Sequence, residues 1–444
     1  MTNRLIHVRQ MSKLAGPIIL ANLAAPILGF VDTAVIGQLG QTHLLGALAL
    51  ASMVFSLLFW VFGFLRMGTT AMVAQAKGGG NREETQRLLI RAVLLGTGLG
   101  ILICALQVPL AQLIFGLSGA SAGVKEATLT YYQIRIWGAP LHLAILGITG
   151  FLLGQQRTSL VLLLQIVLNL SNILLDLIFV LMLDWAVAGV AAATLIAEGI
   201  TLAVAGYLLT TQFQWQGFKP DMAQLLDLEA LGRFFRVNRD IMIRTFCLII
   251  AFAWFTDQGA RLGDISLAAN LILMQFVTFS AFFIDGFAIA GESMVGEAKG
   301  ARNLRAIRAT VHAAFFTGGC IAILMSLTFF MISDWGFSLL STQPEIIETA
   351  QRYSLWMLAT PLISFPAYIL DGLFIGTTRT REMRQAMIAS LGIYLLAWFL
   401  TTDLLNHGLW LSLMIYYGAR AISLGYYYPR LYWFDDDVIK EPSK

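Results

Sequence analysis

The stretch from Gly16 to Gly40, GPIILANLAAPILGFVDTAVIGQLG, is long and apolar enough to cross a bilayer, yet it contains a carboxylate, Asp32. A charged side chain at membrane depth costs roughly 2.5–3.5 kcal/mol on insertion scales, so it usually faces a partner or an ion or substrate path. Pro17 and Pro26 lie on the same span, where each removes a backbone donor and clashes with the preceding turn. We therefore expect the first helix to be bent, or able to bend, beside a functional site.

The composition of the 444-residue chain is that of a membrane protein, with 58% hydrophobic residues, 12% charged residues and a mean hydropathy of +0.74. A soluble domain has about half apolar and a quarter charged residues. We therefore predict an all-α integral membrane protein with twelve transmembrane helices. The predicted spans are residues 12–37, 44–74, 88–114, 126–154, 159–183, 186–211, 239–261, 266–296, 309–333, 346–375, 385–403 and 407–428.

Basic residues gather on alternate connections between these spans, and the opposite connections hold little beyond Lys125, Arg261 and Arg352. By the positive-inside rule, both termini are predicted to be cytoplasmic, in agreement with an even number of spans. We expect the lipid bilayer, and no nucleic acid, to be the partner of these basic connections. The residues on the predicted cytoplasmic side are Arg4, Arg9, Lys13, Lys77, Arg82, Arg87, Arg91, Arg157, Lys219, Arg233, Arg236, Arg239, Arg244, Lys299, Arg302, Arg305, Arg308, Arg379, Arg381 and Arg384.

The second half of the chain repeats the first at a shift of 222 residues, half of its 444-residue length. Residues 72–78, MVAQAKG, match residues 294–300, MVGEAKG. The same shift places Asn81, Gly150, Gly154, Arg157 and Thr158 on Asn303, Gly372, Gly376, Arg379 and Thr380. Because six spans separate the copies, both halves have the same orientation, which predicts two six-helix lobes related by a parallel pseudo-two-fold repeat, with a site near the membrane midplane.

This repeat also sets the expected domain boundaries. Residues 1–211 form the N-terminal lobe and residues 239–430 the C-terminal lobe. Residues 212–238 are predicted to be a cytoplasmic inter-lobe linker with a short amphipathic surface helix, and residues 431–444 a cytoplasmic tail.

Several polar residues of the first half lie at membrane depth. Asn172 and Asp176 are four residues apart and share one helix face, and Thr194 and Glu198 have the same spacing in the next span. With Asp32, the cluster of Asn172, Asp176 and Thr194 offers two carboxylates, an amide and a hydroxyl. These groups could hold a proton between two carboxyls or a hard cation such as Na⁺. The alternative, above all for Asn172 and Thr194, is simple helix–helix hydrogen bonding.

The repeat shift places four aromatic residues opposite this cluster. Trp254, Tyr394, Trp398 and Tyr416 correspond in order to the aspartate, asparagine, aspartate and threonine of the first half. Aromatic faces suit planar or cationic organic molecules. Packing in a core or an interface is the alternative.

Glu198 is a secondary candidate site residue, as are Arg66, Asp285 and Asp371 among four other charges at membrane depth. Arg66, Arg135, Asp285 and Asp371 could form buried ion pairs or could line a path. Arg66 and Asp285 lie on the repeat-related second and eighth spans, so we predict that they pair.

No enzyme motif is present in the sequence. It lacks a GxxxxGK[ST] phosphate loop, HExxH and GxSxG, and its three cysteines have no metal-ligand spacing. We therefore expect no catalytic residues, no cofactor and no metal site beyond a possible Na⁺ ion at the Asp32 cluster. Transport without a nucleotide site must draw on an ion gradient.

Four motifs carry a family resemblance: FVDTAVIGQLG after two prolines in the first span, NLSNILLDL in the fifth, NRDIMIRT at the start of the seventh and LDGLFIGTTRTREMR at the end of the tenth. With the two six-span halves, they resemble the multidrug and toxic compound extrusion (MATE) transporters, most closely their DinF (DNA-damage-inducible protein F) branch. The resemblance implies a bacterial inner-membrane antiporter that expels organic cations and other amphipathic drugs in exchange for H⁺ or Na⁺.

The resemblance also implies roles for particular residues. It places the cation or proton site of that branch at Asp32, Asn172, Asp176 and Thr194, and it implies that a bend at a proline like Pro17 accompanies protonation. The other main branch uses carboxylates in its second half, and this chain does not clearly reproduce that set, since Asp371 is placed differently relative to the following glycine.

We expect a monomer that works by alternating access, in which protonation of Asp32 and Asp176 alters the packing of the bent first span and drives drug release. The runner-up is a flippase for lipid-linked precursors, from the same wider superfamily. Such a flippase should have extra spans or a basic cavity for phosphate, whereas only Arg66 and Arg135 lie near the midplane. A membrane-embedded enzyme or a channel is a third class, and neither explains the repeat.

Overall fold

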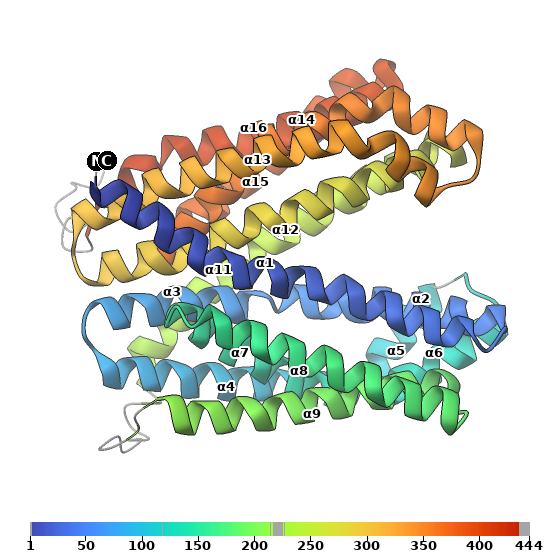
Figure 1. Cartoon of the computed structure of the whole chain (residues 1–444), viewed down its shortest axis with the longest axis horizontal. Coiled ribbons are helices and arrows are strands. Elements are labelled where there is room, and N and C mark those ends of the chain that lie inside the picture. The colour runs from blue at the N-terminus through green and yellow to red at the C-terminus, as the bar shows by residue number, and fades with distance from the viewer. Residues whose placement is uncertain (1, 118, 214, 216–224, 226, 435–444) are drawn as a thin grey trace. The chain divides into compact units, whose positions relative to one another are not determined.

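We describe the chain from a computed structural model, which describes residues 2–117, 119–213, 215, 225 and 227–434. The regular structure in these ranges is helical (Figure 1). This follows from the sequence, because a backbone in lipid must satisfy its hydrogen bonds internally and an α-helix does so within one segment.

The helices of the first half are mostly long and apolar. They are α1 (Thr2–Gly37), α2 (Thr42–Val61), α3 (Phe64–Gly78), α4 (Arg82–Ala105), α5 (Gln107–Leu117), α6 (Ala122–Arg135), α7 (Ala139–Gly154), α8 (Thr158–Asp176) and α9 (Ala186–Gln212). The helices of the second half are α11 (Leu228–Arg261), α12 (Asp264–Gly300), α13 (Leu304–Leu340), α14 (Pro344–Gly376), α15 (Thr380–Thr401) and α16 (Leu405–Tyr426). Four short helical turns are η1 (Ile136–Gly138), η2 (Leu177–Met182), η3 (Thr402–Leu404) and η4 (Tyr428–Tyr432).

These helices account for twelve transmembrane segments. Among the described residues, 10 stretches are long and apolar enough to cross a membrane by length and composition alone. One of them, Thr380–Tyr426, contains both α15 and α16, which pack against each other and are separated only by η3. The remaining segment is the 34-residue α11, whose charged first turns lower its mean hydropathy. The protein is therefore an all-α membrane protein with twelve spans.

The predicted inter-lobe linker is only partly visible. Residues 214, 216–224 and 226 of the linker, and residues 435–444 of the predicted tail, lie outside the described residues. Helix α11 begins at Leu228, inside the predicted linker, and continues without a break to Arg261. The expected short surface helix falls partly outside the described residues and stays a prediction.

The chain divides into two compact units. Unit 1 contains residues up to Ile19, residues 74–80 and the chain from Phe235 onward, and unit 2 contains residues 20–73 and 81–234. Helix α1 is continuous through Pro17 and Pro26, although its two parts belong to different units.

Glycine contacts show the internal repeat within each unit. In unit 2, a Cβ added to Gly150 would lie 2.5 Å from the backbone oxygen of Arg66. In unit 1, a Cβ added to Gly372 would lie 2.4 Å from the backbone oxygen of Ala288. Both residues of the second pair stand 222 positions after those of the first, half the length of the chain. Each unit thus uses a glycine at the same place to bring two helix backbones together.

The turns between helices repeat in the same register. The side chain of Asn81 accepts a hydrogen bond from the N–H three residues ahead (2.9 Å), and that of Asn303 does the same (3.1 Å). Gln156 and Thr378 both have positive φ angles, 60° and 55°. The predicted parallel repeat is therefore a repeat of local geometry as well as of sequence.

The close glycine contacts predict a stability difference between two substitutions in unit 1. A Cβ at Gly376 would lie 2.2 Å from the backbone oxygen of Glu292, whereas nothing lies within 4 Å of a Cβ at Gly392. We expect Gly376→Ala to destabilise the protein by about 1–3 kcal/mol through overpacking. Its Tm in detergent should fall by about 2–10 °C. Gly392→Ala, the matched control, should leave the Tm unchanged or slightly higher; equal Tm values for the two variants would contradict the packing account.

Candidate functional site

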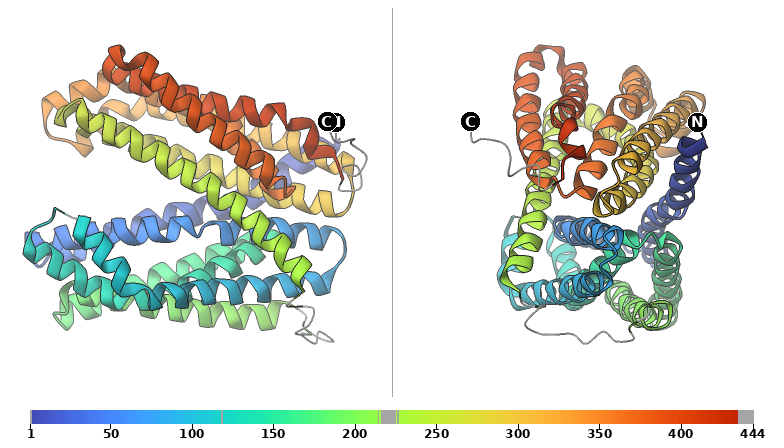
Figure 2. Two further views of the ribbon diagram at one scale, coloured as in Figure 1. Left: turned by 180° about the vertical axis from the view of Figure 1, so that it is seen from behind. Right: turned by 90° about the vertical axis from the view of Figure 1, so that its left-hand side faces the viewer.

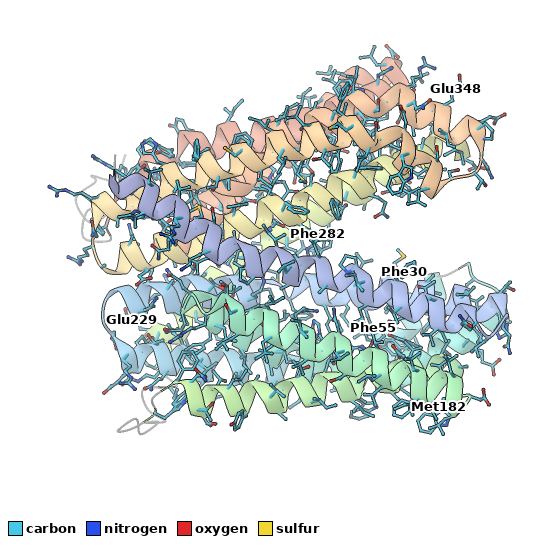
Figure 3. All side chains as sticks on the ribbon, viewed as in Figure 1. Phe30, Phe55, Met182, Glu229, Phe282 and Glu348 are labelled. Carbon is cyan, nitrogen blue, oxygen red and sulfur yellow. The ribbon has the colours of Figure 1, made fainter. Side chains whose placement is uncertain are left out.

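The structure brings Asp32, Asn172, Asp176 and Thr194 together inside unit 2. Helices α8 and α9, which carry the last three, pack side by side (Figures 1 and 2). Asp32 is 8% exposed, Asn172 and Asp176 are fully buried, and Thr194 is partly buried. The neighbouring Phe30, labelled in Figure 3, is 74% exposed on the opposite face of α1, so the apolar side chain faces outward and the carboxylate inward.

The amide of Asn172 bridges the two carboxylates. Its nitrogen donates to Asp32 Oδ1 (3.3 Å) and to Asp176 Oδ2 (3.0 Å), while its oxygen lies 3.1 Å from the Thr194 backbone nitrogen and 3.1 Å from the Thr194 hydroxyl. We assign this amide orientation from the hydrogen-bond network, because the opposite one would aim a carbonyl oxygen at two carboxylates. The four predicted residues thus form one connected set of polar groups.

The two carboxylates of this set lack a basic partner. Asp176 Oδ1 is buried without a hydrogen-bond partner in the described part of the chain. Within the same residues, no lysine, arginine or histidine forms an ion pair with Asp32 or Asp176. Two acidic groups held close together in an apolar setting favour sharing a proton or binding a cation.

A π-helical turn follows the second carboxylate directly. Helix α8 ends at Asp176 and continues as η2, in which the Leu183 N–H donates to the Ile178 carbonyl five residues earlier (3.0 Å). Such turns are rare and occur frequently at functional sites. Met182, the last residue of η2, is labelled in Figure 3. Hydropathy gave no sign of this turn, since one extra residue in a helical turn does not alter the apolar pattern.

Two further residues extend the site. Asn169 Nδ2 donates to the backbone oxygen of Ala24 (2.7 Å), which ties α8 to α1 two residues before Pro26. Tyr131 on α6 is buried and its hydroxyl interacts with the Thr194 side chain. Asn169 could have been found from its position three residues before Asn172, whereas nothing in the sequence distinguished Tyr131 from a core tyrosine.

Glu198, a secondary candidate, forms a buried ion pair with Arg135. The arginine donates Nη1 to Oε2 (2.9 Å) and Nη2 to Oε1 (2.6 Å), which is a bidentate arrangement. The Nδ1 atom of His142 lies 2.9 Å from the same Oε1. The Arg135 guanidinium also lies 5.5 Å from the ring of Phe55, labelled in Figure 3. Both charges are therefore compensated within unit 2.

Gly138 leaves the space that this ion pair needs. A Cβ at this position would lie 2.4 Å from Arg135 Nη1 and 2.6 Å from Glu198 Oε2. The absence of a side chain at Gly138 is thus part of the Arg135–Glu198 pair.

Asp371, the candidate in the second half, is also neutralised by arginines. Its Oδ2 accepts from Arg244 Nη2 (2.7 Å) and from Arg420 Nη2. Arg244 was grouped with the cytoplasmic basic residues, but it is only 8% exposed, because it lies well inside the continuous α11. Arg420 was not singled out by the sequence. This pairing makes Asp371 a poor candidate for binding a cation.

The remaining candidates divide between the units. Arg66 lies in unit 2 and Asp285 in unit 1, so their pairing stays a prediction. Tyr394, Trp398 and Tyr416 are buried in the hydrophobic core of unit 1, in agreement with the packing alternative. In the described ranges, no group of three or more His, Cys, Asp or Glu side chains could hold a metal ion.

The fold and the buried polar sites together define a polytopic helical membrane protein with repeated six-helix halves. The family model described as MatE matches residues 17–178 and 241–401. The chain is 37% identical over 411 residues to DNA damage-inducible protein F of Escherichia coli K12, which covers 93% of this chain and 90% of that protein. It is 24% identical over 441 residues to the probable multidrug resistance protein NorM of Pseudomonas syringae pv. tomato, with 93% of each covered.

Solved structures show the same fold. An outward-facing multidrug resistance MATE family transporter of the MOP superfamily superimposes with a TM-score of 0.84 at 18% identity, covering 96% of each chain. The Vibrio cholerae MATE transporter VcmN in its bent form has a TM-score of 0.85 at 20% identity, covering 97% of this chain and 98% of that one. The chain belongs to the MATE family of multidrug efflux transporters, and it is a membrane transporter rather than an enzyme.

The Arg135–Glu198 pair predicts an asymmetry between buried and exposed ion pairs. Glu198→Gln leaves the buried Arg135 charge without its counter-charge. We expect the free energy of unfolding to fall by about 3–5 kcal/mol. The control is Glu229→Gln, which breaks the exposed 3.8 Å pair with Arg233 and should cost about 0–1 kcal/mol.

Thermal unfolding of both variants in the same detergent checks this prediction. The double variant Arg135→Met with Glu198→Leu should recover most of the loss, because it removes both charges. If Glu198→Gln unfolded at the same temperature as Glu229→Gln, the pair would have no structural role.

Proposed function

We propose that this protein is a secondary antiporter of the bacterial inner membrane that exports organic cations and other amphipathic drugs in exchange for H⁺, with Na⁺ as the alternative coupling ion. The observation that carries the proposal is the Asn172 amide, which bridges Asp32 and Asp176 while no basic side chain pairs with either in the described ranges. Carboxylates at membrane depth that are not neutralised by arginine are free to exchange ions. Both termini are cytoplasmic in this proposal, and the transporter is a monomer.

The chemistry follows from the charge of the cluster. With both carboxylates ionised, the cluster carries two negative charges and attracts an organic cation. A proton that binds at Asp176 Oδ1, which has no other hydrogen-bond partner among the described residues, leaves one negative charge. The weaker attraction then favours release of the drug. The bound organic cation is thus exchanged for a proton.

Helix α1 connects this charge change to movement. Asp32 and Pro17 lie on the same helix, and Pro17 stands two residues before Ile19, where the helix passes from one unit to the other. When the proton passes on to Asp32, the hydrogen bond from Asn172 to Asp32, which holds α8 to α1, becomes weaker, since bonds to ionised acceptors are the stronger ones. The helix can then bend at Pro17, where a backbone hydrogen bond is missing.

Two alternatives are less well supported. The oxygen atoms of the cluster would also suit Na⁺, so the ion is decided by experiment. A flippase for lipid-linked precursors would need a basic pocket for phosphate beside the site. In unit 2, Arg135 is occupied by Glu198 on two hydrogen bonds, which supports the drug exporter instead.

Asp32→Asn tests the proposal. The variant keeps the size of the side chain but cannot be ionised, so we expect proton-driven export of a fluorescent organic cation from proteoliposomes to fall at least tenfold. Asp184→Asn is the matched control, because Asp184 is an exposed aspartate of unit 2 with a positive φ of 56° that asparagine tolerates.

The same vesicles distinguish the ions. Export by the wild type should respond to an imposed pH gradient, and response to a Na⁺ gradient alone would select the alternative ion. If folded Asp32→Asn exported drug at the wild-type rate under either gradient, the site would be wrong.

A further inference from the structure

A second buried polar cluster lies in unit 1, on α11, α14 and α16. Asp371 Oδ2 accepts from Arg244 Nη2 (2.7 Å) and from Arg420 Nη2. The three side chains are 4%, 9% and 1% exposed, respectively. Among these three side chains, one carboxylate faces two guanidinium groups, which is a net charge of +1. A second carboxylate, Asp285 of α12, acts electrostatically on Tyr368 and Tyr417, which pack on Arg420.

The cluster also has a surplus of hydrogen-bond donors. Arg244 Nε, Arg420 Nε and Arg420 Nη1 are buried without a partner in the described residues. The one unused acceptor among these three side chains is Asp371 Oδ1. A buried donor without a partner is costly, and a charged one more so. The arrangement is therefore complete only with an additional acceptor.

Tyrosine side chains lie close to these hydrogen-bond donors. The hydroxyls of Tyr394, Tyr416 and Tyr417 are buried. Those of Tyr394 and Tyr417 interact with Ser412 and Tyr368, respectively, whereas that of Tyr416 has no hydrogen-bond partner among the described residues. The Arg420 guanidinium lies 5.6 Å from the Tyr416 ring and 5.8 Å from the Tyr417 ring. The rings of Tyr394 and Tyr416 are 5.4 Å apart. Aromatic faces and the Tyr416 hydroxyl thus lie around the Arg420 guanidinium.

The donors and charges of this cluster determine which kind of acceptor it would bind. Water can accept hydrogen bonds, but it brings no negative charge to the two guanidinium groups. A cation would meet two arginines. An anionic group supplies both acceptor oxygens and the opposite charge, and guanidinium groups pair favourably with carboxylate and phosphate.

We propose that Arg244, Asp371, Tyr416, Tyr417 and Arg420 form an anion-binding site, which takes one carboxylate or phosphate group of an aromatic or amphipathic solute. Asp371 and Arg420 lie five and six residues before the ends of α14 and α16, which is the predicted cytoplasmic side. The solute would enter from the cytoplasm. The site extends the substrate class to anionic and zwitterionic molecules and does not depend on the identity of the coupling ion.

Binding of three probes to the purified full-length protein in nanodiscs tests the site. Naphthalene-2-carboxylate should bind, and the uncharged naphthalene-2-carboxamide should bind at least tenfold more weakly by isothermal titration calorimetry. Inorganic phosphate is the third probe. Competition by phosphate would show that a free anion is enough, and its absence would show that the organic part is needed; both support an anion site.

Variants connect this binding to the cluster. Tyr416→Phe removes one hydroxyl and keeps the ring, and it should weaken carboxylate binding about fivefold. The matched control is Tyr353→Phe, a buried tyrosine of unit 1 whose ring packs on His407 at 4.7 Å, and it should bind as the wild type does. Arg420→Gln should abolish binding if it folds.

Asp32→Asn should bind the carboxylate normally, so failure of the anion site is distinguishable from failure of the coupling site. The proposal is overturned if the carboxylate does not bind, if the carboxamide binds equally well, or if Tyr416→Phe binds the carboxylate as tightly as Tyr353→Phe.

Discussion

Compensation of charge at membrane depth is the constraint on which the rest of the structure depends. Glu198 and Asp371 are each held by arginine, at distances of 2.6 Å to Arg135 and 2.7 Å to Arg244. Asp32 and Asp176 are linked instead by the neutral amide of Asn172. A carboxylate fixed by arginine keeps its charge throughout a transport cycle, whereas one held by an amide can take up and lose an ion. On this difference we base the proposal that Asp32 and Asp176 exchange ions, whereas Glu198 and Asp371 keep their charge.

The two units share a scaffold but not a chemistry. Gly150 and Gly372 make equivalent backbone contacts in their own units, so the repeat preserves how the helices pack. The positions of unit 1 that correspond to Asn172, Asp176 and Thr194 of unit 2 carry the buried aromatic residues Tyr394, Trp398 and Tyr416. A duplicated framework therefore carries paired carboxylates in one unit and arginines with tyrosine rings in the other, and we propose that only the first exchanges ions.

Local sequence patterns predicted much of the fold and part of the candidate site. The repeat, the spans and the shared face of Asn172 and Asp176 follow from spacing alone. The Arg135–Glu198 and Arg244–Asp371 pairs could not be predicted, because their partners are 63 and 127 residues apart and meet only through helix packing. The distribution of basic charges along the chain assigns Arg244 to the cytoplasmic side, but it carries no information on how deeply the side chain is buried.

The account's central claim is that ion exchange takes place at Asp32 and Asp176 and not at Asp371. Infrared difference spectroscopy of the purified protein between acidic and alkaline conditions detects protonated carboxyl groups directly. We expect a carboxyl band in the wild type that disappears when Asp32 and Asp176 are both replaced by asparagine. A band that persists unchanged in that double variant and disappears in Asp371→Asn would contradict the account.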